Sequence, residues 1–339
     1  MDSSALLPPW TAFRGKSTPP EPFQEETLIP LLRRNPEYNL RWVVSSNPLN
    51  ASKIASRYHF EKYGCDYEAV LNDPETDLVL ISAPNNLHYS MVMQAIKARK
   101  SVFVEKPLCL TRQELDDIKN AWEESSRAGE SVPVFVGFNR RYAPQILKIR
   151  EIMKKLDGPF MISFRANVGF TPANRWVQDP EVGGGRIIAE CCHFFDLFNF
   201  LLQQSEPPEI QVASAVINGS TTVAKDNVSV TLRYRDGSVA TLVYVSLGDK
   251  AMDRERLEVF GQGVSIVLED FKRLTVYRSG KAYETSSLPK QDKGWSSEFF
   301  ELAKYLKQDK SSKMISFEEC VSATDLTLRV DDAVRQGSA

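Results

Sequence analysis

The sequence predicts an α/β protein: a doubly wound parallel sheet, followed by an α+β domain with a largely antiparallel sheet. Short apolar strands alternate with helical segments up to about residue 141, and beyond it several strands follow one another with turns between them. The alternation is typical of right-handed βαβ units, and runs of strands bracketed by helices indicate an antiparallel sheet. A chain of 339 residues is too long for one ordinary core and suits two domains.

Residues 1–22 are rich in proline and serine and are expected to be irregular. A helix is expected from residue 23, with Pro30 near its first turns. The apolar run at 78–82 suits a parallel sheet covered on both faces. The other elements expected in this part are a strand at 40–44, a helix at 50–58 capped by Asn50, a helix at 85–98, a strand at 102–104, a helix at 112–127 and a strand at 132–136.

The second part mixes helices with a meander of strands, and the turn Asp236-Gly237 predicts a hairpin. The expected helices are 145–156, 186–202, 295–307 and 317–336, and the expected strands are 160–168, 211–218, 227–234, 239–247, 257–260, 265–268 and 274–278. We therefore divide the chain into an irregular N-terminus (1–22), a doubly wound α/β domain (23–143) and an α+β domain (144–339).

Composition excludes several classes of partner. The formal net charge of −2 favours neither nucleic acid nor an anionic membrane. No apolar run is long enough to span a bilayer, and we expect no signal peptide. The five cysteines lack C-x-x-C spacing, which predicts reduced thiols and a cytoplasmic protein. We expect no metal at Cys191-Cys192-His193, because contiguous helical residues point in different directions.

Lys106 and His193 are the candidate catalytic residues. Lys106 follows the strand 102–104 and precedes a proline, so it stands at a strand end, where open α/β sheets bind ligands. His193 follows the run Gly183-Gly184-Gly185 on an apolar helix. A lysine and a histidine facing one hydroxyl or carbonyl suit nicotinamide-dependent hydride transfer. The alternatives are a solvated strand-end lysine and a core histidine.

Other candidates lie near these two. Asn85 is expected near a nicotinamide ribose or, alternatively, as a helix cap. One of Arg140 and Arg141 is a candidate contact for a cofactor or an acidic substrate, and the other is expected at the surface. Arg175 and Trp176 precede the glycine run and are candidates to wall the site, although a tryptophan is often core.

From about residue 23 onward the chain resembles the glucose-fructose oxidoreductase / inositol dehydrogenase (Gfo/Idh/MocA) family. The matching strings are Ala83-Pro84-Asn85 with His88, Glu105-Lys106-Pro107, 137–141, Trp176, and 183–185 with His193 and Asp196. The stretches 254–261 and 291–294 are closest to the C-terminal part of fused two-part oxidoreductases. The resemblance implies a Rossmann-like domain, a large open-faced antiparallel sheet that commonly forms an oligomer interface, and a cis peptide before Pro107.

The resemblance also implies roles for individual residues. Lys106 and His193 are the expected proton-transfer groups. The family's usual aspartate corresponds to Ala189, so either Glu190 has taken over its orienting role or lysine and histidine act alone. The expected cofactor contacts are Ser45, Ser46, Asn85, His88, Glu105, Lys106, Arg140 and Trp176, and the expected substrate contacts are Lys106, Arg175 and His193.

The N-terminus departs from the family. Pro19-Pro20-Glu21-Pro22 stands where the phosphate-binding glycines belong, and Gly15 lies several residues too early. At the end of the strand 40–44, Ser45-Ser46-Asn47 replaces the usual acidic residue, which slightly favours NADP over NAD. We expect reduced cofactor affinity.

The leading hypothesis is an NAD(P)-dependent oxidoreductase acting at a hydroxyl or keto carbon of a sugar-like, polyol or natural-product substrate. A pseudoenzyme or scaffold subunit without cofactor binding, and a non-redox lyase or isomerase, are the alternatives. The expected partners are a small-molecule substrate and further copies of the chain through the C-terminal sheet, with no nucleic acid and no membrane.

Overall fold

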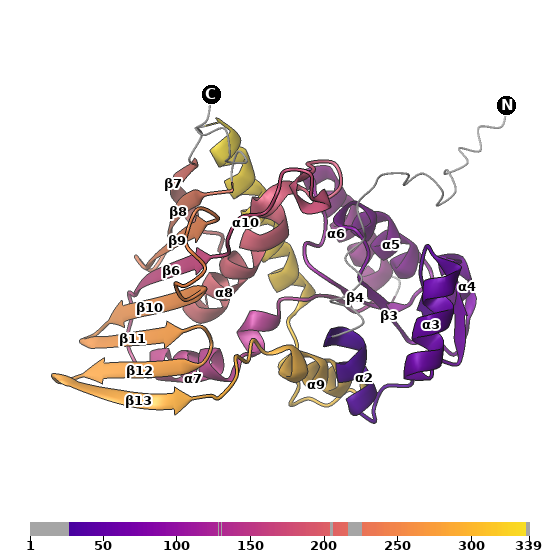
Figure 1. Cartoon of the computed structure of the whole chain (residues 1–339), viewed down its shortest axis with the longest axis horizontal. Helices are drawn as coiled ribbons and strands as arrows, with labels where there is room; N and C mark the ends of the chain where they lie inside the picture. Colours follow the sequence, from indigo (N-terminus) through magenta and orange to yellow (C-terminus); the bar gives the residue numbers. More distant parts are fainter. Residues whose placement is uncertain (1–26, 128, 130, 204–205, 216–225, 337–339) are drawn as a thin grey trace. The chain divides into compact units, whose positions relative to one another are not determined.

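The computed structural model describes residues 27–127, 129, 131–203, 206–215 and 226–336 (Figure 1). The chain divides into two compact units, residues 1–76 and 77–339. The domain boundary expected at residue 143 lies inside the second unit and stays a prediction.

The first unit contains a two-stranded parallel sheet. Its elements are α2 (Ile29–Arg34), β1 (Trp42–Val44), α3 (Pro48–Tyr58), β2 (Lys62–Gly64) and α4 (Tyr67–Asn72). Asp73 ties the strands together, because its Oδ2 accepts hydrogen bonds from the Trp42 Nε1 at 2.7 Å and the Lys62 Nζ at 2.8 Å. The predicted cap of α3 is wrong: the Asn47 side chain, not Asn50, accepts the Leu49 amide at 2.9 Å. The sequence did not predict β2 and α4.

The second unit opens with three parallel strands in the order β3 (Leu78–Ile81), β4 (Ser101–Val104) and β5 (Val134–Val136). The helices α5 (Asn85–Lys97) and α6 (Arg112–Arg127) connect them. Every residue of β5, and all but the first of β4, is buried. The Rossmann-like pattern of strand and helix predicted here is confirmed.

The second unit continues into an eight-stranded sheet, in the order β13-β12-β11-β10-β6-β9-β8-β7. Only the β6–β9 pair is parallel; the other neighbours are antiparallel, as predicted. The strands are β6 (Met161–Asn167), β7 (Glu209–Ala215), β8 (Val228–Arg233), β9 (Val239–Val245), β10 (Glu255–Gly261), β11 (Val264–Glu269), β12 (Arg273–Arg278) and β13 (Lys281–Ser287). The strand β13 was not predicted, and residues 216–218 of the strand expected at 211–218 lie outside the described residues.

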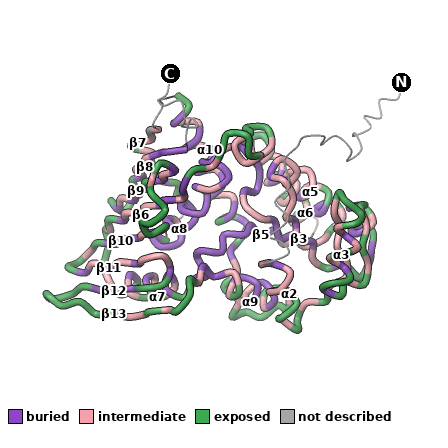
Figure 2. Tube along the Cα trace, viewed as in Figure 1, coloured by how far each residue is buried: buried purple, intermediate pink, exposed green. Residues whose placement is uncertain are grey.

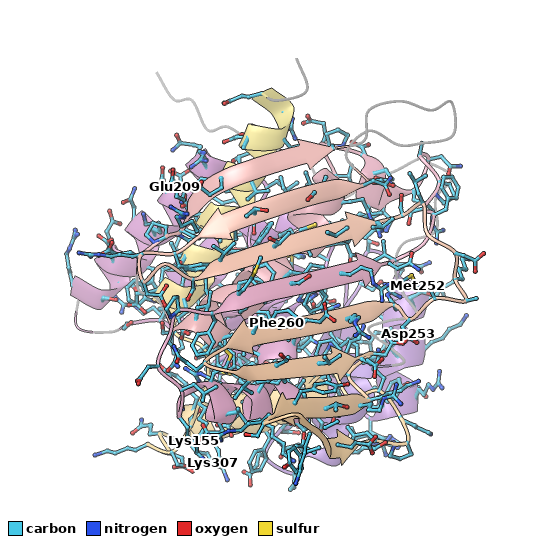
Figure 3. All side chains as sticks on the ribbon, turned by 90° about the vertical axis from the view of Figure 1, so that its left-hand side faces the viewer. Lys155, Glu209, Met252, Asp253, Phe260 and Lys307 are labelled. Carbon is cyan, nitrogen blue, oxygen red and sulfur yellow. The ribbon has the colours of Figure 1, made fainter. Side chains whose placement is uncertain are left out.

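Helices cover one face of this sheet. Figure 1 shows α7 (Pro144–Met153), α8 (Cys192–Leu202) and α10 (Phe317–Gln336) on the same side. The helix α9 (Trp295–Leu306) packs on the parallel strands instead, with the Phe299 ring 5.0 Å from the Phe103 ring and the Tyr305 ring 4.9 Å from the Phe135 ring. The strands alternate between buried and more exposed residues (Figure 2), and Phe164, Phe194 and Leu242 fill the core beneath the helices. Figure 3 looks onto the opposite face, which no helix of the described residues crosses and where Phe260 is 40% exposed. The sheet is therefore open-faced.

A short 3₁₀ turn, Asn139–Tyr142, joins the parallel strands to the rest of the unit. The Arg140 guanidinium makes two hydrogen bonds of 3.0 Å to Glu255 at the start of β10. Lys293 also pairs with Glu255, and Arg141 pairs with Asp196 on α8. Buried charges need such partners, so this turn fixes where β10 and α8 lie relative to β5.

Lowering the pH should reduce the free energy of unfolding, because Glu255 is ionised in the folded protein. Burial disfavours its charged form, but Arg140 and Lys293 lower the pKa of the carboxyl to about 2. An unfolded glutamate titrates near about 4.3, so the ionised group stabilises the fold by roughly 3 kcal/mol above about pH 5, and this is lost as the pH falls toward 2. We expect urea unfolding to show Glu255→Gln as less stable than wild type at pH 7, with the difference shrinking on acidification. A difference that is constant with pH would contradict this role.

Candidate functional site

Lys106 lies directly after β4, at the carboxyl end of the parallel strands. Its Nζ donates a hydrogen bond to the backbone carbonyl of Ala189 at 2.8 Å and lies 3.8 Å from Oε1 of Glu190. The side chain is 21% exposed, so the amine is held in place but remains accessible to a ligand. The Lys106–Pro107 peptide is cis, as the resemblance implied.

The segment that meets Lys106 is a π-helical turn, Ile187–Cys191, directly before α8. The sequence predicted one regular helix over residues 186–202, and this is wrong for the first turn. π turns inside helices are frequent at functional sites. Here the carbonyl of Ala189, in the middle of the turn, accepts a hydrogen bond from a side chain of another element.

Glu190 supplies the negative charge beside the lysine. Its side chain is 26% exposed. Burial alone would raise the pKa of the carboxyl, but Lys106, Arg186, Arg140 and Arg254 outweigh it and lower the pKa below the ordinary value. Glu190 is therefore an anion at neutral pH, and its negative charge lies beside the Lys106 Nζ.

His193 lies one turn of chain beyond Glu190, in the first turn of α8. It is 6% exposed, and its Nδ1 has no hydrogen-bond partner among the residues that the structure describes. Burial lowers the pKa of His193 well below the ordinary value, and Arg140, Lys106 and Lys293 lower it further. The ring is therefore uncharged at neutral pH, with one donor and one acceptor nitrogen.

The first turn of α5 holds the loops of the site together. The ring nitrogens of His88 contact two backbone carbonyls, Pro107 at 2.7 Å from Nδ1 and Ala83 at 3.0 Å from Nε2. The Asn85 amide donates to the carbonyl of Gly183 at 2.8 Å. Both residues were predicted to contact a cofactor. Both ring nitrogens of His88 face backbone carbonyls, to one of which a neutral imidazole can donate, and the Asn85 Nδ2 is bound to the glycine loop.

Close packing and backbone conformation require glycine at two positions of the run 183–185. A Cβ on Gly183 would lie 2.4 Å from the Val177 Cα, and Gly184 has a positive φ of 79°. Trp176, in the short 3₁₀ turn Trp176–Gln178, is half-buried, and Arg175 before it is exposed. The loop 182–185 thus packs against the turn that carries Trp176.

The remaining predicted contacts lie in different surroundings. The Glu105 carboxyl lies over Gly137, where a Cβ would come within 3.2 Å of it, and burial raises its pKa to about 7 against the opposing effect of Lys106. Arg140 is 7% exposed and bound to Glu255, and Arg141 is 3% exposed. Neither arginine is a surface residue, although the sequence analysis expected one of them to be.

In the first unit, the hydroxyl of Ser45 accepts the Asn47 amide at 3.3 Å. Ser46 is the next residue along the chain. The segment 45–47, directly after β1, contains no carboxylate side chain. Gly15 and Pro19-Pro20-Glu21-Pro22 lie outside the described residues, so the predicted phosphate loop has no structural description.

Sequence reasoning missed four charged residues near this site: Arg186, Asp226, Arg254 and Glu255. Arg186 comes four residues before Glu190, a spacing that places two side chains on the same face of a helix. The other three flank strands of the large sheet, and no local pattern marks them. Within the described ranges, no three His, Cys, Asp or Glu side chains are grouped to hold a metal ion, and no helix is long and apolar enough to cross a membrane.

Two family models match the chain. One, described as an oxidoreductase family with an NAD-binding Rossmann fold, matches residues 22–132, and the other, the GFO/IDH/MocA C-terminal domain, matches residues 149–267. The chain belongs to the GFO/IDH/MocA oxidoreductase family. The family predicted from the sequence is confirmed, and with it an oxidoreductase.

This GFO/IDH/MocA protein is similar to several named oxidoreductases. The uncharacterized oxidoreductase YrbE of Bacillus subtilis is 26% identical over 82% of this chain and 79% of its own length. The myo-inositol 2-dehydrogenase of Thermotoga maritima is 27% identical over 64% of this chain and 63% of its own length. The aldose-aldose oxidoreductase of Caulobacter crescentus has the same fold, with a TM-score of 0.79 at 17% identity over 93% of this chain and 95% of that one.

The residues after β4 fit the nicotinamide end of the cofactor that this family binds. A partly exposed amine and a buried imidazole nitrogen without a partner are the groups needed beside an oxygen whose carbon exchanges a hydride. The predicted phosphate site, at residues 19–22, lies outside the part of the chain that the structure describes.

Replacing His88 with Phe should loosen Lys106, because the imidazole contact with the Pro107 carbonyl is lost while ring volume is kept. A hydrogen bond contributes about 1 kcal/mol, so acetic anhydride should label the Lys106 amine about five times faster. Mass spectrometry would report this labelling relative to that of Lys310, which is exposed.

The matched control is His59→Gln, which changes an exposed histidine and should leave the ratio of Lys106 to Lys310 labelling at the wild-type value. An unchanged ratio in His88→Phe would show that His88 does not hold the lysine.

Proposed function

We propose that this GFO/IDH/MocA protein is an NAD(P)-dependent dehydrogenase or reductase acting at a hydroxyl or keto carbon. The observation that carries the proposal is the Lys106 amine, bound to the Ala189 carbonyl beside Glu190 and within electrostatic range of His193. The hydrogen bond to Ala189 uses one of the three ammonium protons, so the others remain for a substrate oxygen.

Each residue has a distinct proposed role. Lys106 donates a hydrogen bond to the reacting oxygen and stabilises the negative charge that develops on it. The unpartnered nitrogen of the uncharged His193 exchanges the hydroxyl proton. Glu190 orients Lys106. A bound NAD(P) would accept or supply the hydride at the same carbon.

The proposed cofactor contacts remain those of the sequence analysis, with two refinements. Ser45, Ser46, Glu105, Lys106, Arg140 and Trp176 stay candidates for direct contact, whereas Asn85 and His88 would act by holding the loops around Lys106. The absence of a carboxylate from Ser45-Ser46-Asn47 removes a repulsion toward a 2′-phosphate, so we propose NADP ahead of NAD.

The proposed substrate is a sugar-like, polyol or related natural product, since one relative is named a myo-inositol 2-dehydrogenase. We propose Arg175 as a substrate contact beside Lys106 and His193. The open face of the eight-stranded sheet carries exposed apolar side chains such as Met161, Phe260 and Tyr277, which supports oligomerisation through this face. The free cysteines support a location in the cytoplasm.

Titration with NADPH and NADH, followed by nicotinamide fluorescence and thermal shift, tests cofactor binding. We expect binding of both at micromolar to millimolar concentrations, with NADPH the tighter, because no carboxylate repels its 2′-phosphate. Absence of binding at millimolar concentrations of either nucleotide would move a pseudoenzyme or a non-redox enzyme ahead of this proposal.

Replacing Lys106 with Met should remove the stabilisation of negative charge at the reacting oxygen. We expect turnover, measured as nicotinamide reduction on a panel of sugars and polyols, to fall by roughly 10²–10³. Lys310→Met, at an exposed position, is the control and should keep wild-type rates. Undiminished turnover in Lys106→Met would remove this lysine from the mechanism.

A further inference from the structure

Several cationic side chains surround Glu190, where the π turn meets one end of the eight-stranded sheet. At this end β6 and β9 finish and β8 and β10 begin. The Glu190 carboxylate lies within electrostatic range of Lys106, Arg186, Arg140 and Arg254. These four cations come from four separate segments of the chain, so tertiary structure gathers them.

Two of the four cations have fixed partners. Arg140 is bound by two hydrogen bonds to Glu255, which it shares with Lys293. Lys106 is bound to the Ala189 carbonyl and lies 3.8 Å from Glu190. The charges of Arg140 and Lys106 are thus balanced by groups already in the fold.

Arg186 is buried without a carboxylate partner. It is 8% exposed, and in the described part of the chain no carboxylate oxygen lies within 4.0 Å of it. One Nη donates to the Thr171 hydroxyl at 3.2 Å, and the guanidinium lies 5.5 Å from the Tyr244 ring centre. Its Nε has no partner among the described residues. Burial would lower the pKa of Arg186, but Tyr244, Glu190 and Asp226 outweigh it and raise the pKa, so the guanidinium is charged. Because neither carboxylate contacts it directly, its Nε is a donor that an anion could occupy.

Arg254 is the exposed member of the group. It immediately precedes Glu255 at the start of β10 and forms no ion pair with any residue that the structure describes. Its backbone carbonyl accepts the Asn167 amide at 2.7 Å, which fixes the arginine at the end of the sheet while its side chain stays accessible.

We propose that Arg186 and Arg254 bind an anionic group of the substrate, so that the substrate is an acid: a sugar or polyol carrying a carboxylate or a phosphate. The inference rests on the proposed function, because it places this anion beside the carbon that reacts at Lys106. Guanidinium groups suit the purpose, since their paired N–H donors match carboxylate and phosphate oxygens.

Calorimetric titration of the full chain with matched compounds tests the proposal, with and without NADP⁺. D-gluconate and D-sorbitol share one polyol skeleton and differ in a carboxylate, and D-sorbitol 6-phosphate carries a phosphate instead. We expect at least one acid to bind about tenfold or more tighter than sorbitol, because a hydrogen bond to a charged group contributes more than a neutral one. Whichever acid binds more tightly shows whether the site prefers a carboxylate or a phosphate.

The preference for an acid should disappear in Arg254→Gln, an exposed position at which the fold is kept, and also in Arg186→Gln. Arg278→Gln, at an exposed arginine at the end of β12, is the matched control and should keep the preference. Equal affinity for sorbitol and the acids, no binding of any of the three at millimolar concentrations, or a preference that survives both substitutions would overturn the proposal.

This titration reads ligand binding and not hydride transfer. An acid preference without nicotinamide turnover would therefore support the anion site while refuting the oxidoreductase chemistry, and turnover of neutral polyols alone would do the reverse.

Discussion

The buried ion pairs of Arg140 and Arg141 are the interactions on which the second unit most depends. Two consecutive guanidinium groups in the turn after β5 bind different elements, one Glu255 on β10 and the other Asp196 on α8. Buried charges tolerate only a narrow geometry, since a displaced partner leaves an uncompensated charge in a low dielectric. The parallel strands, the large sheet and the helix that bears His193 are thereby held in one arrangement.

That arrangement brings Lys106 to the π turn. Lys106 and the Ala189 carbonyl are 83 residues apart in the chain, and His88 and Asn85 fix the loops on either side of their contact. The first turn of α5 therefore acts on the site indirectly: it binds backbone carbonyls of the Pro107 and Gly183 segments and so sets where the amine and the glycine loop lie. Preorganisation of this kind is what a site needs to orient a reacting oxygen.

The charges in this region give neighbouring side chains different charge states at neutral pH. Burial, Arg140 and Lys106 leave His193 uncharged, while Lys106, Arg186 and Arg140 keep Glu190 ionised. Glu105, buried over Gly137, has its pKa raised to about 7. A neutral imidazole, a carboxylate and an ammonium group thus coexist near one point, a distribution of charge states suited to moving a proton between a substrate oxygen and the protein.

The sequence by itself determined most elements and the identity of the chemical groups. Helices 112–127 and 317–336 were predicted to the residue, and Lys106, His193 and Glu190 were identified from short strings. Tertiary structure alone decided the π turn, the partners of Arg140, and the convergence of Arg186 and Arg254 near Glu190. The polar strand β13 and the short strand β2 have too little apolar pattern to predict. Ion pairs and bonds to backbone carbonyls join residues far apart in the chain, so they leave no local periodicity from which they can be read.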